Sequence, residues 1–580
     1  PLLMMGGVVG RFIREFAGTL TAAVVLSVIA SLTLAPMLAS RFMKPMKHAG
    51  SSGSGFAARL VAGYDRALQW ALAHQRTMLV IFGLTVTVAV GSYVLIPKGF
   101  FPLQDTAYIV GSSRAADDVS YEDMLAKHHA LAEILMKEED FLAVSYVVGA
   151  TSPNPNLANG RFYIVLKDRG DRELSSEEII DRLRPKLAQV PGINLVLRTQ
   201  QDVNIGGRGS RSQYQFVLSG ADSTTLGEWA SRLTEKLQSM PQFRDVSNEM
   251  QLGASVTHLH IDRVAAARFG FRAEDIDQVL YDAFGQRQIG EYQNEVNQYR
   301  VILEVDERYR GSVDSLQHFH LRSPLTGGMV PLSAVARLEP PGVGPLTITH
   351  DGMFPSATIS FNLPAGVALG DAIRLVERAQ VEIGMPSSIK GRFRGTAQAF
   401  QDSLATQPWL ILAAIATVYI ILGVLYESFV HPLTILSTLP SAGVGAILSL
   451  WAVGHDFSIM ALIGVVLLIG IVMKNGILLV DFALERQRNG RSARQAIHEA
   501  CLVRFRPIVM TTIAAMLGAI PLMAGIGTGS ELRQPLGIAI FGGLLICQVM
   551  TLYTTPVVYL ALERLFHRRR TRQDAEWTVG

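Results

Sequence analysis

One lysine lies deep inside a long apolar segment of the chain. Lys474 belongs to the run from Phe457 to Phe482, whose neighbouring residues are almost all aliphatic. An ammonium group at this depth in a bilayer is costly, and such groups usually face a bundle interior, pair with a carboxylate and mark an ion or proton path. The sequence therefore predicts a charge-coupled transport role for Lys474. The alternative is a lysine that snorkels to the cytoplasmic surface.

The chain offers this ammonium no acidic partner at a similar depth. Glu15 and Glu427 lie at the ends of apolar segments, and Asp481 lies two turns further along the same segment. The first residues, PLLMMGG from Pro1, read as the tail of a hydrophobic segment already under way. We therefore expect the partner to come from residues that precede Pro1, or otherwise from another subunit.

Hydropathy divides the chain into membrane and extramembrane parts. A mean hydropathy of +0.28 with 49% hydrophobic residues is too apolar for a soluble enzyme. Segments of about 20 apolar residues cross about 30 Å of hydrocarbon. Such segments occupy residues 16–39, 77–96, 409–426, 433–454, 457–482, 508–525 and 536–562. Residues 97 to 407 have an ordinary globular composition and predict a large extramembrane domain.

Basic residues indicate the orientation. They cluster after the first span, between residues 486 and 506, and in the C-terminal tail, whereas the loops at 454–458 and 525–535 carry almost none. The basic side is expected to be cytoplasmic, and the large domain to lie across the membrane from it. The formal net charge of +3 is accounted for by these loops, so no nucleic-acid partner is expected.

The large domain reads as a repeated unit of strand, amphipathic helix, turn and strand. Ser175 followed by Glu178 has the spacing of a capping box. Two such units fit residues 106–199 and 213–395, which predicts ferredoxin-like βαβ modules. The expected domains are spans in 1–40, an amphipathic cytoplasmic linker in 41–76, a span in 77–96, porter module 1 in 97–212, porter module 2 in 213–286 and 342–405, an inserted subdomain in 287–341, a five-helix bundle in 406–566 and a basic tail in 567–580.

Other chemistries find little support. The large domain contains no GxxxxGK[ST] loop, the chain has no GxSxG motif, and Cys501 and Cys547 fall in or against the membrane. The histidine pairs 128/129, 258/260 and 318/320 lack a locatable third ligand, so no metal site is expected. The Gly-rich basic stretch that begins at Asn204 is interpreted as a flexible joint rather than a phosphate cradle.

Several phrases carry a family resemblance. IPKGFFPLQDTAYIVG, YESFVHPLTILSTLP, MKNGILLVDFA and RFRPIVMTT resemble the C-terminal half of resistance-nodulation-division (RND) exporters, and FGQRQI, GTAQAFQDS, GSELRQPLGI and LYTTPVVYL are similar to the MdtB/MdtC branch. The resemblance implies a polytopic α-helical membrane protein with a large α+β periplasmic domain, made of two porter modules and an inserted docking subdomain. It also implies an inner-membrane trimer that exports drugs with an adaptor and an outer-membrane channel. The trimer would contact membrane lipids and use the proton-motive force, with no cofactor.

The same resemblance implies specific site residues. Lys474, Arg504 and Thr511 match the family's proton relay, whose paired aspartates lie in the N-terminal half of the transporter. From the residues alone, Arg504 could equally be a positive-inside anchor, and Thr511 a helix hydroxyl bonded to its own backbone.

The family's switch loop corresponds to residues 149–160. The candidate substrate residues are Tyr146, Gly149, Pro153, Pro155, Gly160 and Phe162. Ser145 and Val147 stand where many multidrug members have phenylalanines, so the aromatic cage is expected to be weaker. A mobile gate and a plain exposed turn both fit this loop.

The leading hypothesis is a proton-driven multidrug exporter subunit, a secondary transporter and not an enzyme. One alternative is a non-coupling partner in a hetero-oligomeric pump. Another is a metal-ion exporter, which is disfavoured because Met510, Met516, Met523 and Met550 form no row.

Overall fold

The computed structural model describes residues 6–42, 56–149, 156–203, 205, 210–250, 253–310 and 313–577. Contacts divide the chain into two compact units. Unit 1 contains residues 1–114, 124–249 and 349–580, and unit 2 contains residues 115–123 and 250–348.

Among the described residues of unit 1, seven helical segments are long and apolar enough to cross a membrane. They are α1 (Gly7–Phe42), α3 (Gln75–Leu95), α10 (Thr396–Tyr426), α11 with α12 (His431–Leu436 and Leu439–Val453), α13 (Ile459–Arg488), α14 (Ala493–Ala524) and α15 (Gln534–Trp577). Each predicted span overlaps one of these helices. The fourth is broken between α11 and α12, where Pro440 lies in the first turn of α12, because proline lacks the N–H that would continue a helix.

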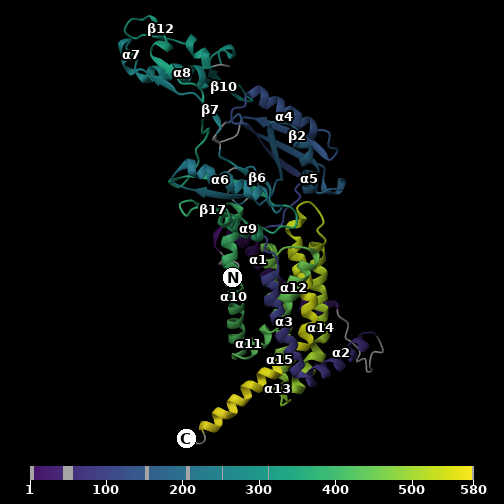
Figure 1. Cartoon of the computed structure of the whole chain (residues 1–580). Coiled ribbons are helices and arrows are strands. Elements are labelled where there is room, and N and C mark those ends of the chain that lie inside the picture. Colours follow the sequence, from purple (N-terminus) through teal and green to yellow (C-terminus); the bar gives the residue numbers. More distant parts are fainter. Residues whose placement is uncertain are drawn as a thin grey trace. The chain divides into compact units, whose positions relative to one another are not determined.

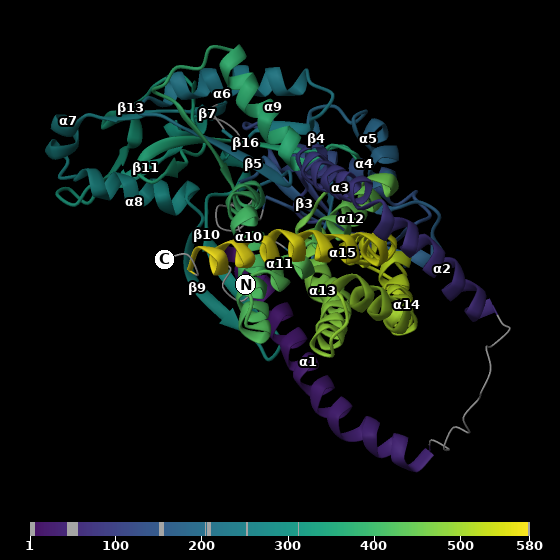
Figure 2. The same cartoon turned by 90° about the horizontal axis from the view of Figure 1, so that it is seen from below.

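The helices α12, α13, α14 and α15 pack side by side, with α15 against the other three (Figures 1 and 2). Close approach of α12 and α15 depends on glycines: a Cβ on Gly445 would lie 2.5 Å from the Gly542 carbonyl oxygen. Small residues of this kind let membrane helices approach closely. The amphipathic helix α2 (Phe56–Ala73) packs on the bundle through buried Tyr64 and Leu68, and His498 Nε2 lies 2.7 Å from Asp65 Oδ1.

The first module has the predicted split βαβ topology. Its elements are β1 (Tyr108–Ala115), α4 (Tyr121–Leu135), β2 (Phe141–Val148), β3 (Asn159–Leu166), α5 (Ser176–Leu187) and β4 (Ile193–Thr199). The sheet order is β2-β3-β1-β4, and β3 pairs antiparallel with both β1 and β2. The predicted capping box is present: Ser175 accepts from the Glu178 N–H, and Glu178 accepts from the Ser175 N–H.

The second module repeats this plan around an interruption. Its elements are β5 (Tyr214–Ser219), α6 (Ser223–Gln238), β6 (Arg244–Asn248), β15 (His350–Asp351), β16 (Phe354–Asn362), α9 (Leu369–Glu382) and β17 (Lys390–Arg394). Strand β16 pairs with β5, β6 and β15, and β5 also pairs with β17. The interruption falls between β6 and β16, as the sequence predicts for an inserted subdomain.

Unit 2 is larger than the predicted insertion at 287–341, because it runs from Met250 to Ile348. Its elements are β7 (Ala254–Val256), β8 (Leu259–Ile261), α7 (Arg263–Arg268), α8 (Ala273–Phe284), β9 (Arg287–Gln293), β10 (Gln298–Leu303), β11 (His320–Arg322), β12 (Met329–Pro331), β13 (Ala336–Leu338) and β14 (Gly342–Gly344). Helix residues Ala266 and Ile276 share a core with Leu321 and Val335. This shared core explains why α7 and α8 belong with the insertion.

Candidate functional site

Lys474 lies on the one exposed stripe of α13. Most other positions around it are buried against neighbouring helices, whereas Gly470, Lys474 and Asp481 are exposed at helical spacing. Within the described part of the chain, no carboxylate forms an ion pair with the Lys474 ammonium. The lysine thus presents its charge on a side of α13 that these helices leave open.

Asn475 and Thr512, the chain neighbours of the predicted relay residues Lys474 and Thr511, form a direct link between two helices. Asn475, beside Lys474, donates from Nδ2 to Thr512 Oγ1 at 3.2 Å, and both side chains are buried. Thr511, beside Thr512, donates to the Ile508 carbonyl of its own helix at 3.1 Å, and Thr512 donates to the same carbonyl at 3.0 Å. The structure therefore brings the Lys474 and Thr511 positions to one level of the bundle through their chain neighbours. Asn475 and Thr512 are not among the residues predicted from the sequence, although a buried amide in an apolar helix is itself a signal.

Arg504 lies on α14 near a second arginine. Its guanidinium is 5.2 Å from the centroid of the Phe482 ring, and the Arg486 guanidinium is 4.8 Å from the same centroid. The Arg504 Nε is buried and has no hydrogen-bond acceptor among the described residues. A guanidinium that lies over an aromatic ring and has an N–H without an acceptor can bind an additional anionic group.

Two candidate substrate residues meet beneath helix α4. Tyr146 and Phe162 are cross-strand neighbours on β2 and β3, with ring centroids 5.4 Å apart. The His128 ring of α4 stacks on Phe162 with centroids 5.0 Å apart and planes at 4°. Phe162 is fully buried, so it belongs to the module core in this structure.

Gly160 and Gly149 flank the predicted switch loop. A Cβ on Gly160 would lie 2.3 Å from His128 Nε2, so only glycine fits under the ring. Gly149 has φ of +72°, a conformation that glycine adopts without strain. Pro153 and Pro155 lie outside the described residues.

The histidine pair His128 and His129 contacts the same group of residues. His128 Nε2 is 2.9 Å from Ser113 Oγ, and its Nδ1 is 2.9 Å from the Met124 carbonyl oxygen. Burial lowers the pKa of His128, the Met124 hydrogen bond partly opposes this, and His129 lowers the pKa further. His129 Nδ1 lies 2.9 Å from the Tyr146 hydroxyl. Among the described residues no three His, Cys, Asp or Glu side chains gather as metal ligands.

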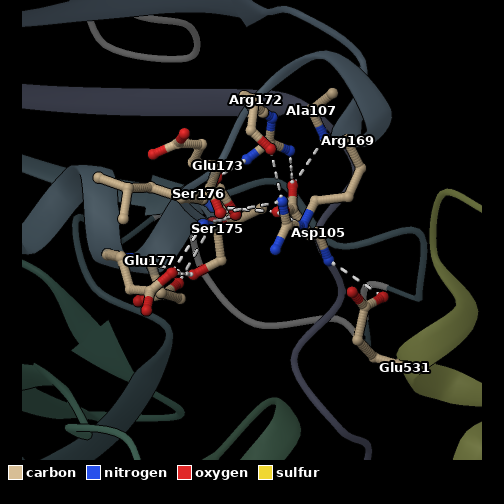
Figure 3. A network of polar contacts seen from close by, with 12 residues as sticks. Asp105, Ala107, Arg169, Arg172, Glu173, Ser175, Ser176, Glu177 and Glu531 are labelled. Atoms are coloured by element: carbon tan, nitrogen blue, oxygen red, sulfur yellow. Dashed lines mark hydrogen bonds and ion pairs between the residues drawn. The ribbon is translucent and has the colours of Figure 1, made fainter. Parts of the chain in front are cut away.

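A polar network holds the chain where it enters the first module (Figure 3). The Asp105 carboxylate pairs with Arg172 and accepts from the Ser176 N–H at 3.0 Å, while the Asp105 N–H donates to Glu531 at 3.4 Å. Burial raises the pKa of Asp105, but the Arg172 and Ser176 hydrogen bonds outweigh it and hold the pKa below its ordinary value. Glu531 belongs to the short helix η6 (Ser530–Leu532) between α14 and α15, so this network links the bundle helices to α5.

This arrangement matches a known family. Residues 1–563 match the model of the AcrB/AcrD/AcrF family. The chain belongs to this family. It is 46% identical over 584 residues to "Multidrug resistance protein MdtC" of Escherichia coli O139:H28, which covers 100% of the chain and 56% of that protein. It is 47% identical over 583 residues to the protein of the same name in Cronobacter sakazakii, which covers 99% of the chain and 56% of that protein.

A solved structure shows the same fold. The crystal structure of a heavy metal efflux pump matches with a TM-score of 0.76 and 20% identity, over 88% of this chain and 53% of that one. Membership of the family confirms the predicted fold class, a polytopic α-helical membrane protein with a large α+β domain. The chain spans about half the length of the curated relatives it matches.

Proposed function

We propose that the chain forms the C-terminal half of an inner-membrane subunit of a proton-driven multidrug exporter. The observation that carries the proposal is the exposed Lys474 stripe of α13, in a chain 46% identical to a protein named for multidrug resistance. The similarity to the heavy metal efflux pump concerns the fold alone.

Lys474 acts in this proposal as a charge switch. A carboxylate from outside the described chain pairs with the Lys474 ammonium across the open side of α13. Protonation of that carboxylate removes a buried opposite charge, which changes the interaction energy by several kcal/mol. Arg504 and Thr511 lie on α14, which Asn475 joins to α13 through Thr512, so α14 responds when α13 shifts.

The response has a physical route to the first module. Helix α14 leads through η6 to Glu531, which accepts from the Asp105 N–H, and Asp105 holds Arg172 and the start of α5. Movement of α14 therefore acts on the module that carries the predicted switch loop. The further proposed partners are a trimer of such subunits, homomeric or heteromeric, an adaptor and an outer-membrane channel, with small amphiphilic compounds as substrates.

The test replaces Lys474 with methionine in the full-length subunit, produced with its adaptor in cells that lack other drug exporters. We expect efflux of a fluorescent substrate to be lost while trimer assembly and membrane level are unchanged. Lys137→Met, an exposed lysine beyond the end of α4, is the matched control and is expected to keep efflux. Normal efflux by the Lys474 variant would instead support a non-coupling partner subunit and overturn proton coupling at this residue.

A further inference from the structure

Helices α13 and α14 form a hairpin at the basic end of the bundle. Residues 489–492 join them, and the Ser492 hydroxyl caps the start of α14 by accepting from the Gln495 N–H at 3.4 Å. This short connection keeps the last turns of α13 beside the first turns of α14. Arg486 and Phe482 of α13 consequently lie close to Arg504 of α14.

Two guanidinium groups share one aromatic ring in this hairpin. The Arg486 guanidinium lies 4.8 Å from the centroid of the Phe482 ring, and the Arg504 guanidinium lies 5.2 Å from it. Both Nε atoms are buried and find no hydrogen-bond acceptor among the described residues. Positive charges beside one ring repel each other, and each buried N–H without an acceptor costs free energy.

One carboxylate lies near this pair of arginines without satisfying it. Glu499 Oε2 is 3.7 Å from Arg486 Nε, which is longer than a hydrogen bond. Both side chains are partly exposed, so solvent screens their attraction. In the part of the chain that the structure describes, Arg504 forms no ion pair with any carboxylate. The cluster of Arg486, Arg504 and Glu499 therefore keeps a net positive charge and two unused donors.

An exposed apolar stripe of α14 begins beside the cluster. Val503 is the chain neighbour of Arg504, and Met510, Ile513 and Leu517 follow Val503 along one side of the helix at helical spacing. All four side chains are exposed, and α14 is long and apolar enough to span a membrane. The stripe is therefore suited to contact with the acyl chains of a lipid.

The position of the cluster in the bundle indicates the kind of anion that fits it. The basic residues between 486 and 506 mark the end of the bundle expected to be cytoplasmic, and anionic phospholipids attract such residues to that leaflet. Arginine forms strong charge-assisted hydrogen bonds with phosphate oxygens. A zwitterionic headgroup would bring its own cation next to the two arginines, which costs free energy. A headgroup with a net negative charge supplies the missing acceptor without this cost.

We propose that Arg486 and Arg504 bind the phosphate of an anionic phospholipid, whose acyl chains lie along the exposed apolar stripe of α14. The bound phosphate removes the repulsion between the arginines and holds the end of α13 to the start of α14. This site goes beyond the proposed export function and does not depend on it. Lys474 lies about three helical turns away along α13, so the carboxylate proposed to pair with Lys474 is a separate partner.

The test measures hydrogen exchange of residues 485–506 by mass spectrometry in the full-length subunit, reconstituted in lipid nanodiscs. Discs of dioleoylphosphatidylcholine alone are compared with discs that also contain dioleoylphosphatidylglycerol. We expect phosphatidylglycerol to slow exchange by about fivefold or more, because a ligand that binds only the closed form protects it by one plus the ratio of ligand concentration to Kd. Arg486→Gln is expected to lose most of this protection. Arg486→Lys is expected to keep part of it, because lysine retains the charge without the planar fork.

The matched control is Arg494→Gln, which removes an exposed cation from the first turn of α14 outside the cluster. This control is expected to keep the full protection, and it accounts for any general effect of a negative membrane surface on exchange. Protection of Arg486→Gln as strong as that of Arg494→Gln would overturn the proposal.

The unaltered protein provides a second test that needs no variant. Inorganic phosphate added to the phosphatidylcholine discs is expected to give little protection, because it lacks the acyl chains that contact α14. Protection by inorganic phosphate equal to that by phosphatidylglycerol would assign the cluster to a free anion and overturn the lipid site. No slowing of exchange by phosphatidylglycerol would also overturn it, and would favour a carboxylate from outside this chain as the partner of the two arginines.

Discussion

Asn475 and Thr512 join α13 to α14 through a buried hydrogen bond of 3.2 Å between Nδ2 and Oγ1. Thr512→Val removes the Oγ1 acceptor, so the buried Asn475 amide loses this hydrogen bond. Interhelical hydrogen bonds in membranes contribute about 1 kcal/mol, so we expect a comparable loss of stability, measured as a lower thermal midpoint in detergent. Thr511→Val is the control for stability, because Thr511 donates only within its own helix. Its removal breaks no hydrogen bond between α13 and α14. A larger fall for Thr511→Val than for Thr512→Val would contradict this assignment.

Removal of the Asp105 charge is expected to destabilise the start of α5 strongly. Asp105→Asn leaves the Arg172 side chain, which is 0% exposed, without its carboxylate. Breaking a buried pair in this way costs about 3–5 kcal/mol. We expect hydrogen exchange of the α5 amides to accelerate accordingly in mass spectrometry. Glu382→Gln breaks the exposed Lys236 pair of 2.8 Å and should have little effect on exchange, because solvent screens such a pair. Similar exchange in both variants would show that the Arg172 pair does not hold α5.

Gly160 predicts a steric requirement next to the switch loop. Gly160→Ala would place a methyl group 2.3 Å from His128 Nε2 and 2.8 Å from Ser113 Oγ. Overpacking of a close-packed interior typically costs about 1–3 kcal/mol, and the displaced ring would loosen its stacking on Phe162. We expect faster hydrogen exchange in α4 and β3. Gly170→Ala is the control, because a Cβ there meets nothing within 4 Å. Unchanged exchange in the Gly160 variant would mean that His128 can move aside freely.

Asp456 predicts a pH-dependent stability. This residue lies in the loop between α12 and α13, and burial, with a smaller effect of the Asp371 charge, raises its pKa to about 6. The native state therefore favours the protonated form, and a destabilising effect develops as the pH rises from about 4, the ordinary value, to 6. Asp456→Asn should raise the free energy of unfolding at pH 7.5 by about 1 kcal/mol or less, because solvent screens part of the effect, and leave it unchanged at pH 4. The thermal midpoint at each pH reports the change. An equal shift at both pH values would exclude ionisation of Asp456 as the cause.

Asp371→Asn provides an independent check on that prediction. Removal of the Asp371 charge should lower the pKa of Asp456 and produce part of the same gain at pH 7.5. The double variant should then gain less than the sum of the two single variants, because both act through one carboxylate. Fully additive gains would show that the two carboxylates do not interact.

Local sequence patterns determined most of the architecture. The seven spans follow from runs of apolar residues, because a helix must satisfy its own backbone in a bilayer whatever surrounds it. The capping box at Ser175 and Glu178 and the strand–helix alternation of both modules are local in the same sense. The position of Lys474 deep in an apolar run is likewise evident from the sequence alone, without knowledge of its partner.

Only the tertiary structure decided which side chains meet. Phe162 pairs with Tyr146 in register and lies beneath His128, so the alternate residues Arg161 and Tyr163 occupy the other face. The Asn475 and Thr512 link depends on the rotation of two helices about their axes. Helices α7 and α8 join unit 2 through a core that includes Leu321, far along the chain. Strand register, helix rotation and core membership depend on contacts between distant residues, and a single sequence without those contacts leaves them open.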